Sequence, residues 1–357
     1  MSRILFSGYY GLGNAGDEAV LAASIDLLRT ELPGAAFTVL SGNPAATAAE
    51  FKVDAAPRMA PGAVIAAIRS SDLVLSGGGS LLQDRTSMKS LLYYLAILAL
   101  AKRMGKKTMV FAQGIGPLHR PAARRLTARV LRGVDAITVR DADSADLLTS
   151  IGVSQPAPEV TADPVFALRP KVTDRVRAAA AERPVVGVSL RPWPGVEGIL
   201  EPLAHTLSKY DGEFRVQLWP LFPEQDSPLC ASLQSLLPGA GAVPPGLTPG
   251  EWMCLAGWTD AIIGMRLHSL IFGAARGTPI LGISYDPKVD ALLGRLRARA
   301  VGTAASLDTA ALETALDAAL SGDEAKRRDR EMRSAHLQEA AIRNARRAAG
   351  LLSPKSA

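Results

Sequence analysis

Short β-rich runs alternate with longer helical stretches along the whole 357-residue chain, and this alternation limits the possible folds more than any other feature. It is typical of βαβ units, in which crossover helices join parallel strands. A first series of strands is predicted at Ile4–Ser7, Phe37–Leu40, Leu73–Ser76, Thr108–Ala112 and Ala136–Val139. A second series is predicted at Val185–Leu190, Arg215–Trp219, Ala261–Ile263 and Ile280–Ser284. We therefore expect an α/β protein with two Rossmann-type, doubly wound parallel sheets.

The length of the chain and a break between the two series suggest where the domains divide. A chain of this length is typical of two domains. The break is a polar, proline-bounded segment at 163–184, which we interpret as a hinge. We expect an N-terminal domain at 1–168, a C-terminal domain at 169–322, and a basic helix and tail at 323–357. Because such sheets bind ligands at the carboxyl ends of their strands, two of them facing each other would enclose a central cleft.

The composition argues against several classes of function. Aromatic residues make up 5% of the chain, too few for rows of base-stacking side chains, so we expect no nucleic-acid partner. Two cysteines and four histidines are too few for a disulfide framework or a Cys/His zinc cluster. We therefore expect no metal site and a reducing compartment.

The distribution of apolar residues indicates a cytoplasmic protein. The N-terminus enters the strand pattern without the apolar segment and cleavage site of a signal peptide. The longest apolar run is Leu91–Ala101, which is shorter than the roughly 20 residues that cross a bilayer. We expect this run to form a buried helix.

A glycine-rich turn follows the first predicted strand, where SGYYGLGNAGD contains the pattern GxGxxG. A dinucleotide site would also need an acidic residue after the second strand, but Leu40 is followed by Ser-Gly-Asn, which argues against a nicotinamide cofactor. The turn could still offer its amides and a helix N-terminus to an anion or a sugar hydroxyl. Asp17 is interpreted equally well as a helix-start carboxylate or as a catalytic base.

Two more glycine-rich loops follow the third and fourth strands, in SGGGSLLQD and AQGIGP. Each alone could be a tight turn between a strand and a helix. Three such loops at strand ends favour a site lined by backbone donors. The residues expected to form this cradle are Gly11, Gly13, Asn14, Gly16, Gly78, Gly79, Gln83, Gln113 and Gly114.

Arg140 ends the fifth strand and is followed by Asp141-Ala-Asp143. The two aspartates could be read as a metal-diphosphate motif, but they are also ordinary helix-start residues, which is the interpretation we favour. A guanidinium at a strand end suits a phosphate or carboxylate, although an ion pair between Arg140 and an aspartate is an alternative.

The stretch GMRLHSL places Arg266, His268 and Ser269 where a strand gives way to a helix. A lone histidine is usually a surface or core residue. Here, however, a polar trio interrupts an apolar run, which favours a function. Lys288 follows the next strand at another predicted helix start. These residues would present cations at the same edge of the second sheet.

With these motifs in view, the sequence resembles the polysaccharide pyruvyl transferase family, and most closely its CsaB type. The resemblance runs from Gly8 to about Lys288 through GYYGLGNAGDEA, SGGGSLLQD, AQGIGP, TVRD, TADPVF, GMRLHSLIFGA and ISYDPKV. It implies a GT-B-like fold and a pyruvyltransferase that uses phosphoenolpyruvate, without a cofactor. The acceptor it implies is a sugar, N-acetylmannosamine, of a lipid-linked secondary cell-wall polymer that anchors S-layer proteins. Two hydroxyls of that sugar would form a ketal while phosphate is released.

The resemblance also implies roles for individual residues. The family's anion-binding residues match Arg140, His268 and Lys288, with Arg266 and Ser269 in the same motif. His268 is then a candidate proton donor or phosphate clamp, and Asp17 a candidate base. Two alternatives remain: a GT-B glycosyltransferase that uses a nucleotide sugar, and a non-catalytic polysaccharide-binding protein of the same fold.

Basic residues are concentrated in two segments of a chain whose formal net charge is +6. The segment 326–347 holds eight basic and three acidic residues. The segment 120–133 contains no acid and carries Arg120, Arg124, Arg125, Arg129 and Arg132. Either segment could be a solvated surface, or the two could hold the enzyme weakly at the anionic inner face of the membrane.

Overall fold

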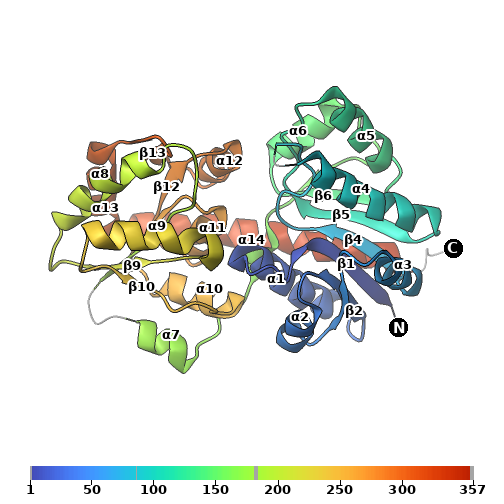
Figure 1. The fold of residues 1–357 in the computed structure, drawn as a ribbon, viewed down its shortest axis with the longest axis horizontal. Coiled ribbons are helices and arrows are strands. Elements are labelled where there is room, and N and C mark those ends of the chain that lie inside the picture. Colours follow the sequence, from blue (N-terminus) through green and yellow to red (C-terminus); the bar gives the residue numbers. More distant parts are fainter. Residues whose placement is uncertain (1, 86, 181–183, 354–357) are drawn as a thin grey trace. The chain divides into compact units, whose positions relative to one another are not determined.

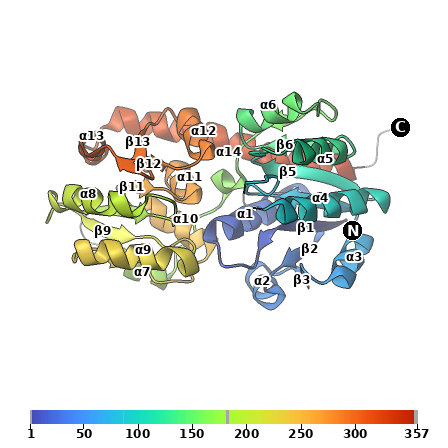
Figure 2. The same cartoon turned by 45° about the horizontal axis from the view of Figure 1, so that its top comes forward.

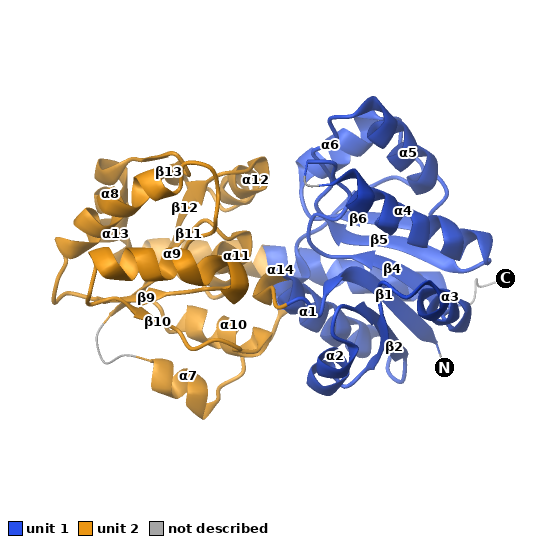
Figure 3. Cartoon of the chain, viewed as in Figure 1, with its two compact units in different colours: residues 1–12, 17–167, 337–357 blue, residues 13–16, 168–336 orange. Residues whose placement is uncertain are grey.

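The chain forms two compact units in the computed structural model, which describes residues 2–85, 87–180 and 184–353 (Figure 3). Unit 1 comprises Met1–Leu12, Asp17–Ala167 and Leu337–Ala357, and unit 2 comprises Gly13–Gly16 and Leu168–His336. The chain thus passes from one unit to the other beside the expected boundary at 168. The segment 323–357, which the sequence analysis sets apart, is divided between the units.

Unit 1 is built on a seven-stranded parallel sheet with the order β3-β2-β1-β4-β5-β6-β7. Its strands are β1 (Arg3–Tyr10), β2 (Ala36–Ser41), β3 (Asp54–Pro57), β4 (Leu73–Gly77), β5 (Lys107–Gln113), β6 (Ala136–Val139) and β7 (Glu159–Val160). Its helices are α1 (Ala15–Glu31), α2 (Pro44–Phe51), α3 (Pro61–Ser70), α4 (Met88–Arg103), α5 (Pro121–Leu131) and α6 (Ala142–Ser150), followed by the 3-10 helix Pro164–Ala167. The five predicted strands are confirmed. The edge strands β3 and β7 were missed because they are short and lack an alternating apolar pattern.

Alternating side chains of the central strand pack against helices on opposite faces of this sheet. Ile4 and Phe6 join the core beneath α1, whereas Leu5 packs with residues of α3 and α4. The apolar run Leu91–Ala101 lies in α4, and six side chains of that helix are buried, which confirms the predicted buried helix.

Unit 2 repeats the architecture with the order β10-β9-β8-β11-β12-β13-β14. Its strands are β8 (Val185–Ser189), β9 (Arg215–Leu218), β10 (Gly241–Ala242), β11 (Ala261–Gly264), β12 (Ile280–Ser284), β13 (Ala300–Thr303) and β14 (Ser306–Leu307). Its helices are α7 (Asp174–Ala179), α8 (Glu197–Ser208), α9 (Pro223–Leu236), α10 (Pro249–Gly257), α11 (Leu267–Ala275), α12 (Pro287–Arg295) and α13 (Thr309–Leu320). The four predicted strands are confirmed, and only the terminal β14 is antiparallel to its neighbour.

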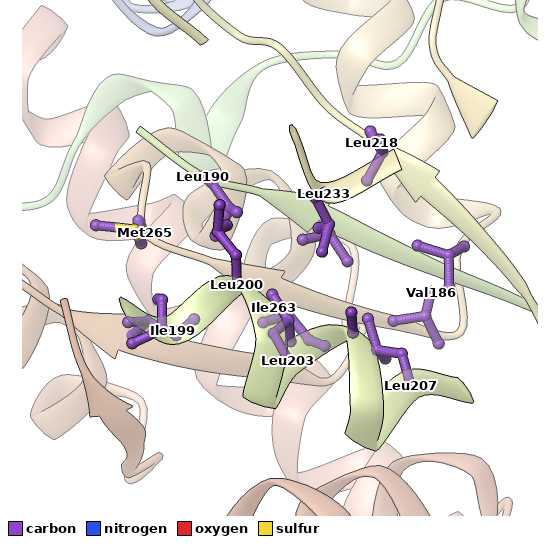
Figure 4. Close-up of a cluster of buried hydrophobic side chains, with 14 of the residues drawn as sticks. Val186, Leu190, Ile199, Leu200, Leu203, Leu207, Leu218, Leu233, Ile263 and Met265 are labelled. Carbon is purple, nitrogen blue, oxygen red and sulfur yellow. The ribbon is translucent and has the colours of Figure 1, made fainter. Parts of the chain in front are cut away.

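The core of unit 2 lies between the sheet and helices α8, α9 and α13. Figure 4 shows Val186 and Ile263 of the sheet beside Leu203 and Leu207 of α8, with Leu233 of α9. Each of these five side chains is at most 2% exposed. This packing holds β8 and β11 rigidly, and the site residues follow directly from those strands.

The last helix, α14 (Glu324–Leu352), is one continuous helix (Figures 1 and 2). Its first half packs on unit 2, where the Arg330 Nε donates to Gly277 O at 2.8 Å. Its second half belongs to unit 1, whose core includes Ala345 and Ala348. Among the described residues, no helix is both long enough and apolar enough to cross a membrane.

Both sheets reverse their strand order at one point, between β1 and β4 in unit 1 and between β8 and β11 in unit 2. The connections on the two sides of such a point leave in opposite directions. Doubly wound proteins bind ligands at such a point, outside the carboxyl ends of the strands. The glycine loops after β1 and β4 and the Arg-His motif after β11 therefore lie at these points of reversal, whereas the loop AQGIGP follows the next strand of unit 1, β5.

Candidate active site

The glycine-rich turn after β1 is held by a carboxylate of α1. Gly11 N and Leu12 N donate to Glu18 Oε1 at 2.7 and 3.3 Å. Burial raises the pKa of Glu18 to about 7, although these two amides oppose the increase. Glu18 stands beside Asp17 in GDEA and was not predicted as a site residue. Because Glu18 occupies these amides, a substrate group would have to replace it to bind there.

Further along this turn, Gly16 lies against His268, and both belong to unit 2. A Cβ added to Gly16 would stand 2.2 Å from His268 Nδ1, so only glycine fits without displacing the imidazole. Gly16 N also donates to Asn14 Oδ1 at 3.1 Å, and Ala15 N donates to Leu221 O at 2.8 Å. The structure therefore joins two motifs that lie 252 residues apart in the sequence.

Gly78 and Gly79, after β4, allow α1 to approach closely. Both have a left-handed φ, +70° and +68°. A Cβ on Gly78 would stand 2.1 Å from Val20 Cγ1, and one on Gly79 would stand 2.9 Å from Asp17 Oδ1. Asp17 thus lies against the second glycine loop, within unit 1.

Several groups of the predicted backbone cradle already form hydrogen bonds within unit 1. Gly78 N donates to Phe111 O at 3.1 Å, and Gly114 N donates to Gly79 O at 2.9 Å. Gln113 is fully buried and donates from Nε2 to Ser76 Oγ at 2.8 Å. Its Oε1 is buried without a hydrogen-bond partner among the described residues. Gln83 lies half-buried in the preceding loop, and Gly13 is exposed.

Arg140 is only 6% exposed and lies among carboxylates. Its guanidinium is 3.5 Å from an oxygen of Asp163 and 3.5 Å from one of Asp141, and it donates to Ser80 Oγ at 2.9 Å. Gly114 leaves room for it, because a Cβ there would stand 2.7 Å from Arg140 NH2. Arg140 is therefore paired with aspartates, as in the second of the two interpretations given for it from the sequence.

Asp141 is the N-cap of α6, and its Oδ1 accepts from Ser144 N at 2.8 Å. This is the helix-start role that the sequence analysis favoured over a metal-diphosphate motif. Among the residues that the structure describes, no group of three His, Cys, Asp or Glu side chains could hold a metal ion.

Arg266 follows β11 and forms a buried, two-pronged ion pair that the sequence did not predict. Its Nε lies 3.1 and 3.2 Å from the two carboxylate oxygens of Asp226, and its NH2 also binds Asp226. Asp226 is fully buried near the start of α9, and it also accepts from Phe222 N at 2.9 Å. The Arg266 guanidinium, at the end of β11, is therefore fixed in position by a buried carboxylate.

His268 and Ser269 occupy the first turn of α11. Ser269 is fully buried and donates from Oγ to Arg266 O at 2.6 Å, so its hydroxyl stabilises the turn. His268 is half-buried. His268 thus has the largest exposed fraction of the predicted trio, although its Nε2 is buried.

Lys288 lies in the first turn of α12, after β12, where it meets residues that the sequence analysis missed. Its Nζ is 5.3 Å from the centre of the Tyr285 ring. From the other side, Arg191 donates from NH1 to Tyr285 Oη at 3.0 Å. Arg191 follows β8, so it stands at the point where the strand order reverses. Its position one residue after a predicted strand was the signal that could have identified it.

Comparison with solved structures agrees with this architecture. The chain is similar to UDP-GlcNAc 2-epimerase from Neisseria meningitidis, with a TM-score of 0.66, 14% identity and coverage of 99% of each chain. It is also similar to HepE from Anabaena, solved with UDP-glucose, with a TM-score of 0.64, 12% identity and coverage of 98% of each chain. A glycosyltransferase from Rickettsia africae gives a TM-score of 0.63 at 11% identity, covering 100% of this chain and 99% of that chain. At these identities the likeness shows the GT-B fold alone.

A comparison with curated proteins finds no match. The sequence profile of the polysaccharide pyruvyl transferases, in contrast, matches residues 14–287. This range includes His268 and ends one residue before Lys288. The chain belongs to the polysaccharide pyruvyl transferase family.

Proposed function

We propose that the protein transfers a pyruvyl group from phosphoenolpyruvate to a sugar of a lipid-linked secondary cell-wall polymer. N-acetylmannosamine is the proposed sugar, and two of its hydroxyls would form a ketal as phosphate leaves. The main support is the set of basic side chains that follow adjacent strands of unit 2, Arg266 and His268 after β11 and Lys288 after β12. Phosphoenolpyruvate carries a carboxylate and a phosphate on three carbons, so its site needs several cations close together.

The proposed roles follow from the contacts of each residue. His268 and Lys288 would bind the donor, while Arg266, held by Asp226, would position the start of α11. Arg140 would reach an anionic group by exchanging a contact with Asp163 or Asp141. Asp17, beside Gly79 in unit 1, would accept the proton of a sugar hydroxyl.

The test combines phosphoenolpyruvate with a panel of lipid-linked N-acetylmannosamine disaccharides. We expect phosphate release that depends on the acceptor, and a product heavier by one pyruvate less one water. We also expect turnover to survive EDTA, because side chains supply the positive charge. Consumption of a UDP-sugar without phosphoenolpyruvate turnover would instead favour a glycosyltransferase, which the solved neighbours make the second candidate. Tight polymer binding with neither activity would indicate a non-catalytic binding protein.

The acceptor would be met at the inner face of the cell membrane, before export of the polymer. The five arginines of the segment 120–133 are exposed, and none of them forms an ion pair among the described residues. This segment, which includes α5, is our proposed membrane contact.

A further inference from the structure

Arg191 and Lys288 are two cations that share one phenol. They come from different connections of unit 2 and lie 97 residues apart in the sequence, yet both contact the side chain of Tyr285. Neither forms an ion pair among the described residues, unlike Arg140 and Arg266. Two like charges this close repel each other unless an anion joins them. The arrangement is therefore that of an anion site built around a tyrosine.

Aromatic rings hold this arrangement in place. The Arg191 guanidinium lies 4.7 Å from the centre of the Tyr285 ring and 5.3 Å from that of Trp193. The two rings meet edge to face at 4.8 Å. Arg191 Nε is buried without a hydrogen-bond partner among the described residues, so ring contacts and Tyr285 Oη set its position. A guanidinium held in this way keeps its charge available, because cation–π contacts do not neutralise it.

The Tyr285 hydroxyl is poised to give up a proton. Its oxygen accepts a hydrogen bond from Arg191, and its own O–H remains able to donate. Burial alone would raise the pKa of Tyr285, but Lys288 and Arg191 outweigh burial and lower the pKa below its ordinary value of 10.0. Other charged groups nearby are Asp226 on α9, which interacts with Arg191, and Asp286, which caps α12. The phenolate left after proton transfer would be stabilised by both cations.

We propose that Tyr285 donates the proton to the methylene carbon of the enol ester, while Arg191 and Lys288 bind the ionised groups of that ester. The proposal rests on the function proposed above. Under this proposal His268 binds the phosphate, which is one of the two roles considered for it.

The chemistry balances without a further reactant. The Tyr285 O–H bond breaks and a C–H bond forms at the methylene carbon, which leaves the adjacent carbon electrophilic. A sugar hydroxyl adds to that carbon and loses its proton. Phosphate then departs with the electron pair of its C–O bond, and the second hydroxyl closes the ketal. Of the two protons released by the hydroxyls, one restores the phenol and the other leaves with phosphate or solvent.

The first test is Tyr285→Phe, which keeps the ring against Trp193 and removes only the hydroxyl. We expect kcat to fall by roughly two to four orders of magnitude, with the KM for phosphoenolpyruvate changed by no more than about threefold. Tyr210→Phe is the matched control. It removes a phenol hydroxyl that donates to Asp317 at 2.7 Å, beyond the end of α8 and away from the strand ends that carry the site. A Tyr285→Phe kcat close to wild type, or a loss confined to KM, would overturn the proposal.

A second test distinguishes proton donation from a structural role. A phenolate cannot donate, so wild-type kcat should fall as the pH rises through the pKa of Tyr285. Arg191→Gln removes one of the cations that lower this pKa, so the fall should move to higher pH. An unmoved alkaline limb would contradict the proposal.

Ultraviolet titration of tyrosine needs no turnover. It should show a phenol that ionises early in the wild type and is missing in Tyr285→Phe. If the titration succeeds but the wild type does not consume phosphoenolpyruvate, the proposed function fails while the cation-bound phenol stands. Turnover without an early-ionising phenol would overturn the further inference alone.

Discussion

At the residue scale, the site depends on charged groups whose partners decide what they can do. Arg140 and Arg266 are nearly buried, and carboxylates balance their charge. Arg191 and Lys288 instead contact the side chain of Tyr285. A cation already paired with a carboxylate gains less from a bound anion, since it must first give up that partner. At the strand ends of unit 2, a cation neutralised by a carboxylate, Arg266, therefore stands beside two cations that have no carboxylate partner among the described residues, Arg191 and Lys288.

The stability of the protein should depend on pH through Glu18, because burial raises the pKa of its carboxyl from 4.5 to about 7. A raised carboxyl pKa means that the folded state holds the proton more tightly than the unfolded state. This contribution to stability is complete below about pH 4.5 and is lost as the pH rises through about 7. Glu18→Gln does not titrate. The wild type should therefore lose about 2–3 kcal/mol of unfolding free energy relative to Glu18→Gln as the pH rises from 4.5 to 8.

Urea unfolding across this pH range provides the measurement. Glu201→Gln, at an exposed position of α8, controls for the change in net charge. A constant difference between Glu18→Gln and wild type at all pH values would show that Glu18 is not perturbed by burial.

At the element scale, the two basic segments differ in whether their arginines form ion pairs. In α14, Arg327, Arg333 and Arg346 each bind a carboxylate at 2.6–2.7 Å. The second half of this helix is also packed into unit 1. In α5, Arg125 and Arg129 are exposed without an ion pair among the described residues. The α5 face is therefore better suited to an anionic surface than the C-terminal helix is.

We predict weak, salt-sensitive binding of the protein to phosphatidylglycerol vesicles and none to phosphatidylcholine vesicles. Basic residues near an anionic membrane contribute about 1 kcal/mol each, so the pair Arg125→Glu and Arg129→Glu should weaken sedimentation with vesicles by roughly thirtyfold or more. The pair Arg327→Glu and Arg328→Glu in α14 changes the net charge equally and should have little effect. If both pairs weaken binding alike, net charge and not α5 is responsible.

At the scale of the whole molecule, the C-terminal helix returns the chain to the unit in which it began. Asn344 is fully buried in unit 1, where its Oδ1 accepts from Thr161 Oγ1 at 2.8 Å and its Nδ2 donates to Ala162 O at 3.0 Å. These bonds join residues more than 180 positions apart. They tie the helix to the segment that follows β7.

Asn344→Leu keeps the branching of the asparagine side chain, although leucine is larger, and it leaves Ala162 O and Thr161 Oγ1 to find other partners. Its free energy of unfolding should fall by roughly 1–3 kcal/mol, as measured by thermal or urea denaturation. Asn344→Asp keeps the oxygen that accepts from Thr161 but loses the amide that donates to Ala162, so it should separate the two contributions. An unchanged midpoint in Asn344→Leu would mean that this helix does not stabilise unit 1 through Asn344.

The main strands and the loops expected to bind ligands could be predicted from the sequence, because both depend on local patterns. Apolar periodicity placed the nine main strands, and glycine-rich turns with Arg-His at strand ends marked where ligands should bind. These features depend on residues within one or two turns of each other. Pairing between distant segments could not be predicted in the same way. Asp226 meets Arg266 across 40 positions and Arg191 meets Tyr285 across 94, and no local pattern distinguishes them from other charged residues. Which cations are neutralised depends on which strand ends the sheet order makes neighbours, and this is visible only in the folded chain.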